Sequence, residues 1–178
     1  MRAIVVRHYK TESNRARNII GWTESPPVTG WESDIELVVS RLQADGVKFD
    51  RVYSSDLTRA VNTGLFYAKT LDIPAVSADP ELREINYGDV ATKSKAWVEK
   101  HIPEHKREPD FVYPNGESFS QMQRRSVRFV EGLTLSHADQ TLLLVVHAGV
   151  IRGLVSYFLG LEYAPNLRHK TSHSYVCS

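Results

Sequence analysis

Two short apolar runs, far apart in the chain, each end at a histidine. Residues 4–6 (Ile-Val-Val) lead into Arg7-His8. Residues 142–146 (Leu-Leu-Leu-Val-Val) lead into His147. A run of β-favouring residues that stops at a polar residue is typical of a central parallel strand. Because ligands of open α/β sheets bind beyond the carboxyl ends of the strands, the two runs predict one shared site at the rim of a sheet.

Strands alternate with helices along the rest of the chain, which is the pattern of a parallel sheet covered by helices. Residues 54–56 (Ser-Ser-Asp) offer N-cap chemistry for one helix. We expect an α/β fold, a three-layer α/β/α sandwich with a mostly parallel central sheet. It forms a single domain over residues 1–178, with a short cap insertion at about 90–115. Helices are expected near 33–43, 57–71, 93–100, 117–133 and 149–159, and further strands at 49–53, 73–77 and 172–177.

The composition argues against several classes of function. A formal net charge of +1 over 178 residues gives no sign of nucleic-acid or membrane-surface binding. No apolar run approaches the roughly 20 residues that span a bilayer, and no signal peptide is visible. The single cysteine, Cys177, cannot form an internal disulfide, so the chain does not depend on an oxidising compartment. We expect a cytoplasmic protein whose partner is a small molecule, with no nucleic acid and no membrane.

Five residues near the expected rim carry chemistry suited to an oxyanion: Arg7, His8, Arg59, Glu84 and His147. Arginine forks match phosphate oxygens in pairs. The helix expected after His147 presents free N–H groups and the positive end of its dipole. Arg59 lies in a helix first turn, where a cation opposes the dipole, so a functional reason for its presence is favoured. Together these groups indicate a ligand with more than one negative charge.

The order and spacing of these residues resemble the histidine phosphatase superfamily, the group that includes cofactor-dependent phosphoglycerate mutases. The resemblance runs from residue 1 to about residue 160. Its elements are an Arg-His pair followed by Asn and Gly, a Ser-Ser-x-Leu-x-Arg-Ala run, and Leu-x-Glu…Gly, Gly-Glu-Ser and His-Ala-Gly elements. They stand here at residues 7–8 with Asn14 and Gly21, then at 54–60, 82–88, 116–118 and 147–149. None is specific alone, but five in the family's order and spacing are a strong resemblance.

The resemblance implies hydrolysis of a phosphomonoester through a phosphohistidine, with no metal and no cofactor. Neutral His8 would attack phosphorus, which splits one hard step into two easier ones. Arg7, Arg59 and His147 would hold the non-bridging oxygens. Glu84 would protonate the leaving alkoxide and then take a proton from water. Further contacts to the substrate are expected from Asn14, from the N–H groups of Gly21 and Gly149, and from the N–H of Tyr9.

Three positions depart from the family pattern. Tyr9 replaces a glycine, so its ring must point away or narrow the pocket. Lys10 replaces a glutamate, and Ile20 stands where mutases carry a small hydroxyl residue. Ile20 and the short cap favour the small phosphatases, among which α-ribazole-5′-phosphate phosphatases look most similar. Two alternatives stay open: a phosphoglycerate mutase-type phosphoryl transferase, and a catalytically weak phosphate-binding regulatory domain, which Tyr9 suggests. The sequence fixes neither the physiological substrate nor the oligomeric state.

Other polar residues have ordinary interpretations. His101 and His105 have the spacing of metal ligands, but Pro103 between them favours a solvated face. Trp22 either lines the pocket or packs in the fold. Arg83 is expected to be a surface cation. We interpret three arginines as the solvated face of a helix: Arg124, Arg125 and Arg128. The sequence shows no partner for His137, His169 and His173, although residues 169–173 could approach the mouth of the site.

Overall fold

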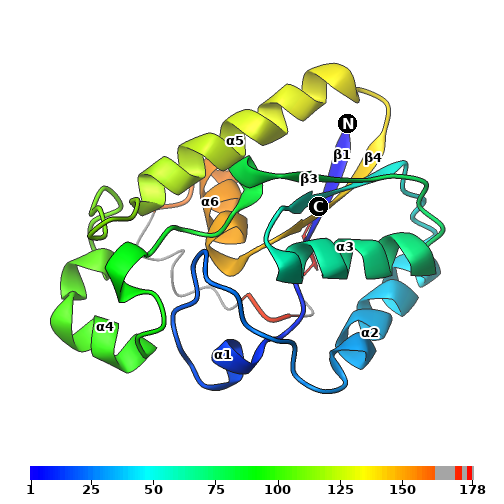
Figure 1. Ribbon diagram of the computed structural model, residues 1–178. Coiled ribbons are helices and arrows are strands. Elements are labelled where there is room, and N and C mark those ends of the chain that lie inside the picture. The colour runs from blue at the N-terminus through cyan, green and yellow to red at the C-terminus, as the bar shows by residue number, and fades with distance from the viewer. Residues whose placement is uncertain (163–170, 174–175, 178) are drawn as a thin grey trace.

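The computed structural model describes residues 1–162, 171–173 and 176–177 (Figure 1). Its centre is a five-stranded sheet in the order β3-β2-β4-β1-β5. The strands are β1 (Arg2–Arg7), β2 (Arg51–Ser55), β3 (Val76–Asp79), β4 (Thr141–Val146) and β5 (Val176–Cys177). The first four are parallel and β5 runs antiparallel to β1. Because Arg7 pairs with Val146, the two histidines that follow these residues leave the sheet side by side.

Helices cover both faces of this sheet, which confirms the three-layer α/β/α sandwich (Figure 1). On one face lie α5 (Phe119–Ser136) and α6 (Ala148–Leu159), and on the other lie α2 (Trp31–Ala44) and α3 (Thr58–Thr70). Side chains of β4 alternate between the two cores. Leu142, Leu144 and Val146 enter the first core, whereas Leu143 and Val145 enter the second. The strand is therefore buried on both faces, as its uninterrupted apolar sequence predicts.

The insertion expected at about 90–115 leaves the sandwich and forms a small cap around α4 (Lys95–His101), at the lower left of Figure 1. Short 3-10 helices flank α4 at Gly88–Val90 and Pro103–Lys106. The cap is tied to the loop that holds α1 (Glu12–Arg15), because Ile19 donates its N–H to the carbonyl of Lys93 at 2.8 Å. The loop and the cap thus form two walls that face each other beside the sheet rim.

The expected N-cap at residues 54–56 is wrong. Pairing with β3 extends β2 through Ser55, so Ser54 and Ser55 are fully buried in the sheet. The N-cap of α3 is Leu57, which has no side-chain cap. The carboxylate of Glu24 accepts the free N–H of Thr58 instead, at 3.1 Å. A residue distant in sequence therefore satisfies the helix N-terminus, and local sequence could not indicate it.

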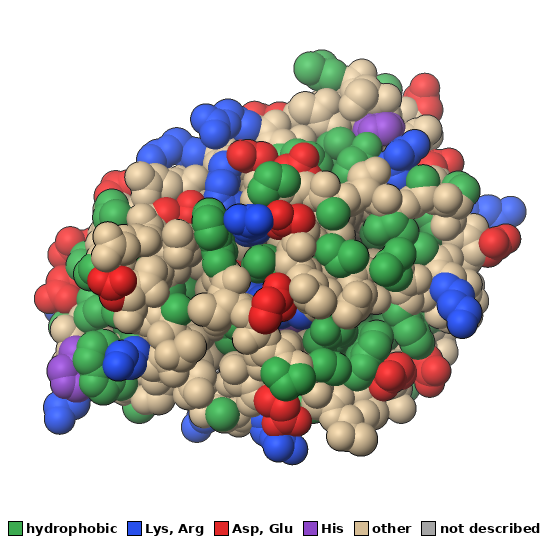
Figure 2. All heavy atoms as spheres, in the orientation of Figure 1, with side chains coloured by type: hydrophobic (Ala, Val, Ile, Leu, Met, Phe, Trp, Pro, Cys, Tyr) green, Lys and Arg blue, Asp and Glu red, His purple; other side chains and the backbone are tan. Residues whose placement is uncertain are grey.

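Boundaries of the other elements shift by a few residues from expectation. The edge strand β3 begins at Val76, so Pro74 precedes it and does not need to donate to the sheet. Within the described part of the terminal segment, only Val176–Cys177 forms a strand. On the face drawn in Figure 2, basic and acidic side chains are interspersed. Among the described residues, no helix has the length and apolarity that crossing a membrane requires.

Candidate active site

His8 leaves the end of β1 and is almost completely buried, at 3% exposure. Its Nδ1 lies 2.6 Å from the carbonyl oxygen of Tyr9. Since a carbonyl can only accept, Nδ1 carries the proton in the neutral ring and Nε2 keeps its lone pair. Burial lowers the pKa of His8 well below its usual value, and the charges of His147, Arg59 and Arg7 lower it further. His8 is therefore a neutral imidazole with a free nucleophilic nitrogen at neutral pH.

His147 is fully buried beside His8, and their ring centroids are 4.9 Å apart. It is the N-cap residue of α6, in extended backbone conformation, and so lies at the positive end of that helix. Neither of its ring nitrogens has a hydrogen-bond partner among the described residues. Burial lowers its pKa well below the usual value, and the positive charges of Arg59 and Arg7 lower it further. An unpaired buried imidazole costs free energy unless a ligand satisfies it, which indicates a binding role.

Two guanidinium groups supply positive charge to this pair of imidazoles. Arg59 is 1% exposed, and it donates to the carbonyls of Gly21 at 2.6 Å and Thr23 at 3.0 Å. Arg7 donates to the carbonyl of Thr171 at 2.7 Å. Burial is the main cause that lowers the pKa of Arg7 to about 10, so it remains charged at neutral pH. In the described part of the chain, the Nε atoms of both arginines are buried without a hydrogen-bond partner.

The electrostatic sum at this rim favours an anion. Two cations lie beside two neutral imidazoles, and buried nitrogens of Arg7, Arg59 and His147 have no hydrogen-bond partner among the residues that the structure describes. Desolvated cations with unsatisfied N–H groups are costly on their own and bind a phosphate group strongly. The residue types expected from the sequence are thus brought together by the fold.

Glu84 approaches the same rim from the loop after β3. Its carboxylate accepts the N–H of Gly149 at 3.1 Å and the N–H of Ile85 at 3.0 Å. A Cβ atom added to Gly149 would overlap Glu84 Oε1, so the carboxylate keeps this position only when residue 149 has no side chain. Arg125, which was expected on a solvated helix face, contacts this loop: it donates to the carbonyl of Glu84 at 2.9 Å. The solvated interpretation of Arg125 is wrong, because the loop closes over that part of α5.

The four expected substrate-binding residues take different places. Asn14 and Gly21 both line the cavity beside the rim. Gly149 also lines it, but its N–H is already donated to Glu84. Tyr9 donates its N–H to Thr63 Oγ1 at 3.0 Å and packs its ring against Trp31, with centroids 4.5 Å apart. Tyr9 thus points away from the pocket, and its N–H and that of Gly149 are both donated within the protein rather than left for a phosphate.

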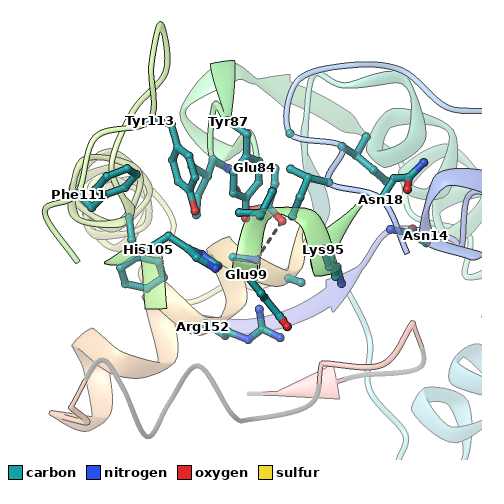
Figure 3. Close-up of a pocket in the computed structure, with 18 of the residues that line it drawn as sticks. Asn14, Asn18, Glu84, Tyr87, Lys95, Glu99, His105, Phe111, Tyr113 and Arg152 are labelled. Carbon is teal, nitrogen blue, oxygen red and sulfur yellow. Dashed lines mark hydrogen bonds between the residues drawn. The ribbon is translucent and has the colours of Figure 1, made fainter. Parts of the chain in front are cut away.

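A cavity of about 290 Å³ opens beside the histidines, between the cap and the sheet rim (Figure 3). This size is near the lower end for small-molecule sites. Figure 3 shows the aromatic rings of Phe111 and Tyr113 on one side of the cavity and the basic side chains of Lys95 and Arg152 on another. Arg7 and Glu84 are among its lining residues, whereas His8, Arg59 and His147 are buried outside the lining. The cavity therefore suits the part of a ligand that extends away from the phosphate.

The structure also shows the surroundings of residues whose roles the sequence left open or predicted wrongly. The ring of His173 packs against His8 with centroids 5.6 Å apart, and its Nδ1 lies 2.8 Å from the His8 carbonyl oxygen. Trp22 donates its indole N–H to the carbonyl of Glu84 at 2.7 Å. Arg83 pairs with Asp56 through two short hydrogen bonds, so it is more than a surface cation.

The remaining histidines lie in different surroundings. His105 lines the cavity rather than a solvated face, whereas His101 stacks on Trp97. His137 has Tyr53 as a partner at 2.8 Å. His169 lies outside the described residues. No local signal in the sequence marks His105 as facing a ligand site, because the path of the cap determines it.

Known proteins are similar to this chain over most of its length. The family profile of the histidine phosphatase superfamily (branch 1) matches residues 3–177. A metal-independent phosphoserine phosphatase of Arabidopsis thaliana is 33% identical over 159 residues, which are 85% of this chain and 66% of that protein. A 2,3-bisphosphoglycerate-dependent phosphoglycerate mutase of Brucella melitensis is 28% identical over 167 residues, which are 89% of this chain and 81% of the mutase. The crystal structure of the alpha-ribazole phosphatase from Shigella flexneri matches with a TM-score of 0.82 and 25% identity, over 99% of this chain and 88% of that one.

Proposed function

This chain belongs to the histidine phosphatase superfamily, and we propose that it hydrolyses a small phosphomonoester without a metal, through a phosphohistidine on His8. One observation carries the proposal. The neutral rings of His8 and His147 lie 4.9 Å apart, beside the buried guanidinium of Arg59 and the partly buried guanidinium of Arg7. The Nε atoms of both arginines have no hydrogen-bond partner within the described part of the chain. Such a set binds the phosphoryl oxygens and leaves His8 Nε2 free to react.

In the first step, His8 Nε2 attacks phosphorus and the bond from phosphorus to the leaving oxygen breaks. Glu84 in its protonated form gives its proton to that oxygen, and the alcohol leaves. In the second step, a water oxygen attacks the phosphohistidine and the P–N bond breaks. The Glu84 carboxylate takes a proton from this water, so inorganic phosphate leaves and the enzyme returns to its starting state. Arg7 and Arg59 neutralise charge on the transferring group throughout, and His147 offers it a hydrogen bond.

The walls of the cavity bear on the alcohol part of the substrate. Rings of Tyr87, Phe111, Tyr113 and Phe119 line it, so an aromatic or apolar leaving group would be well packed. The Shigella flexneri relative is named for alpha-ribazole. α-Ribazole 5′-phosphate, which joins an aromatic base to a phosphorylated ribose, is therefore the substrate we put first.

A phosphoglycerate mutase-type transferase is the second candidate. The basic side chains of Lys95 and Arg152 line the cavity and favour an acidic substrate, and the Brucella melitensis relative is named as such a mutase. The third candidate, a weak phosphate-binding domain, has less support. It was suggested by Tyr9, whose ring packs against Trp31 rather than narrowing the site.

The test is release of inorganic phosphate by chelator-treated protein from a panel of phosphorylated compounds. The panel contains α-ribazole 5′-phosphate, 3-phosphoglycerate, phosphoserine, phosphohistidine and p-nitrophenyl phosphate. We expect hydrolysis without a bisphosphorylated primer, and its loss in His8→Ala. Isomerisation of 3-phosphoglycerate that depends on a primer would favour the mutase. A parent protein inactive on every ester, or a His8→Ala variant as active as the parent, would contradict the proposal.

A further inference from the structure

A short 3-10 helix (Pro80–Leu82) ends two residues before Glu84, and the loop around Glu84 has no regular secondary structure. A general acid must nevertheless stay within hydrogen-bond reach of the leaving oxygen. The loop therefore needs an external support. One side chain of α5, Arg125, reaches across to supply it.

Arg125 donates hydrogen bonds to the main chain of this loop at two positions. Its Nη1 donates to the carbonyl of Glu81 at 2.6 Å, and its Nη2 donates to the carbonyl of Glu84 at 2.9 Å. The side chain is only 12% exposed. A planar guanidinium fixes several acceptors at once, so it holds these carbonyls in one arrangement.

Glu117 completes the support from the other side. It pairs with Arg125 through both carboxylate oxygens, with Nη2 to Oε1 at 2.7 Å and Nε to Oε2 at 3.2 Å. The same Oε1 accepts the N–H of Asn86 at 2.8 Å. One largely buried ion pair thus bonds the loop main chain at residues 81, 84 and 86, before, at and after the acid.

We propose that the Arg125–Glu117 pair positions Glu84 for proton transfer to the leaving oxygen. The inference rests on the proposed function, and it adds a role for two residues that do not themselves touch the reacting atoms. Its physical basis is that proton transfer is sensitive to distance. A displacement of about 1 Å can cost on the order of a hundredfold in rate. Replacing either partner would release the loop and leave the other charge unpaired.

The test compares two kinds of substrate in Arg125→Gln, Arg125→Lys and Glu117→Gln. An alkyl phosphate needs its leaving oxygen protonated, whereas p-nitrophenolate leaves readily without a proton. We expect kcat for the alkyl phosphate to fall by about 10- to 100-fold in Arg125→Gln and Glu117→Gln. The fall for p-nitrophenyl phosphate is expected to be much smaller, and Arg125→Lys to recover part of the loss. The KM of both substrates should change little.

Arg124 provides the matched control, because it is the neighbouring arginine on α5 and is exposed. Arg124→Gln should leave both rates near those of the parent. Melting curves of each variant report whether the fold survives, and Glu117→Gln keeps the size of the side chain if Arg125→Gln does not fold. An equal loss on both substrates, or no loss, would overturn the inference while hydrolysis through His8 stands. Failure of the parent to hydrolyse any ester would instead refute the proposed function.

Discussion

The carboxylate of Glu84 rests against the main chain of Gly149 at the first turn of α6. Sequence could identify both residues by type and spacing, but it could not show that they contact each other. That contact joins elements 65 positions apart, and it uses the N–H that was expected to bind phosphate. Arg125 was missed for the same reason: a loop distant in sequence closes over its helix face. At the scale of single residues, identities were predictable and pairings were not.

Gly149→Ala tests this contact. Its Cβ would overlap Glu84 Oε1, so the carboxylate must move and the rate of ester hydrolysis should fall by about a hundredfold. Steady-state kinetics on an alkyl phosphate measures the effect. The matched control is Gly132→Ala in α5, where a Cβ meets nothing within 4 Å. That change should leave activity intact and raise stability by roughly 0.5–1 kcal/mol. Full activity in Gly149→Ala would contradict the placement of Glu84.

At the scale of elements, the adjacency of β1 and β4 creates the site. Their register sets Arg7 opposite Val146, so the next residue on each strand is a histidine at the same rim. The two apolar runs predict this arrangement because both strands are buried on both faces. By contrast, the ends of β2 and β3 depend on sheet pairing, and the sequence misplaced them by a few residues.

Thr171 and His173 lie against Arg7 and His8. The ring of His173 packs on His8, and the carbonyl of Thr171 accepts a hydrogen bond from Arg7. Replacing His173 with alanine should expose His8 and increase its modification by diethyl pyrocarbonate severalfold. Peptide mass spectrometry of the His8 peptide measures the rate. His137, which is distant in sequence and bonded to Tyr53, serves as the internal reference and should be unchanged. Equal protection of His8 in parent and variant would show that His173 does not cover it.

At the scale of the molecule, family membership and the layered fold were the most predictable features, because they rest on patterns that extend along the chain. Five separate motifs and the alternation of strands with helices both extend over more than a hundred residues. The cavity was less predictable. Its walls come from the cap and the facing loop, whose paths depend on contacts such as the bond from Ile19 to Lys93. The residue types in the cap therefore did not predict which substrate the cavity binds.

The buried histidines make global stability depend on pH. Burial, helped by Arg7, lowers the pKa of His173 from 6.5 to about 4, and the pKa values of His8 and His147 also lie well below 6.5. In the unfolded chain each would bind a proton near 6.5. Their contribution to stability is therefore complete above about pH 6.5 and is lost as the pH falls towards the folded values. Urea unfolding at a series of pH values measures this loss.

His173→Gln isolates one part of that dependence. Between about pH 6.5 and about pH 4, the variant should lose roughly 2 kcal/mol less than the parent, because one titrating group is removed. Identical slopes in the two proteins would mean that His173 is not held neutral by the fold.

The most direct measurement for the whole account is to trap the phosphoenzyme. The protein is mixed with substrate and quenched in alkaline denaturant, in which phosphohistidine survives, and its peptides are examined by mass spectrometry. The account predicts one phosphoryl group on His8, none in His8→Ala, and a greater amount in Glu84→Gln when p-nitrophenyl phosphate is the substrate. Rapid phosphate release with no phosphoryl group on His8, or with the group on His147 instead, would contradict it.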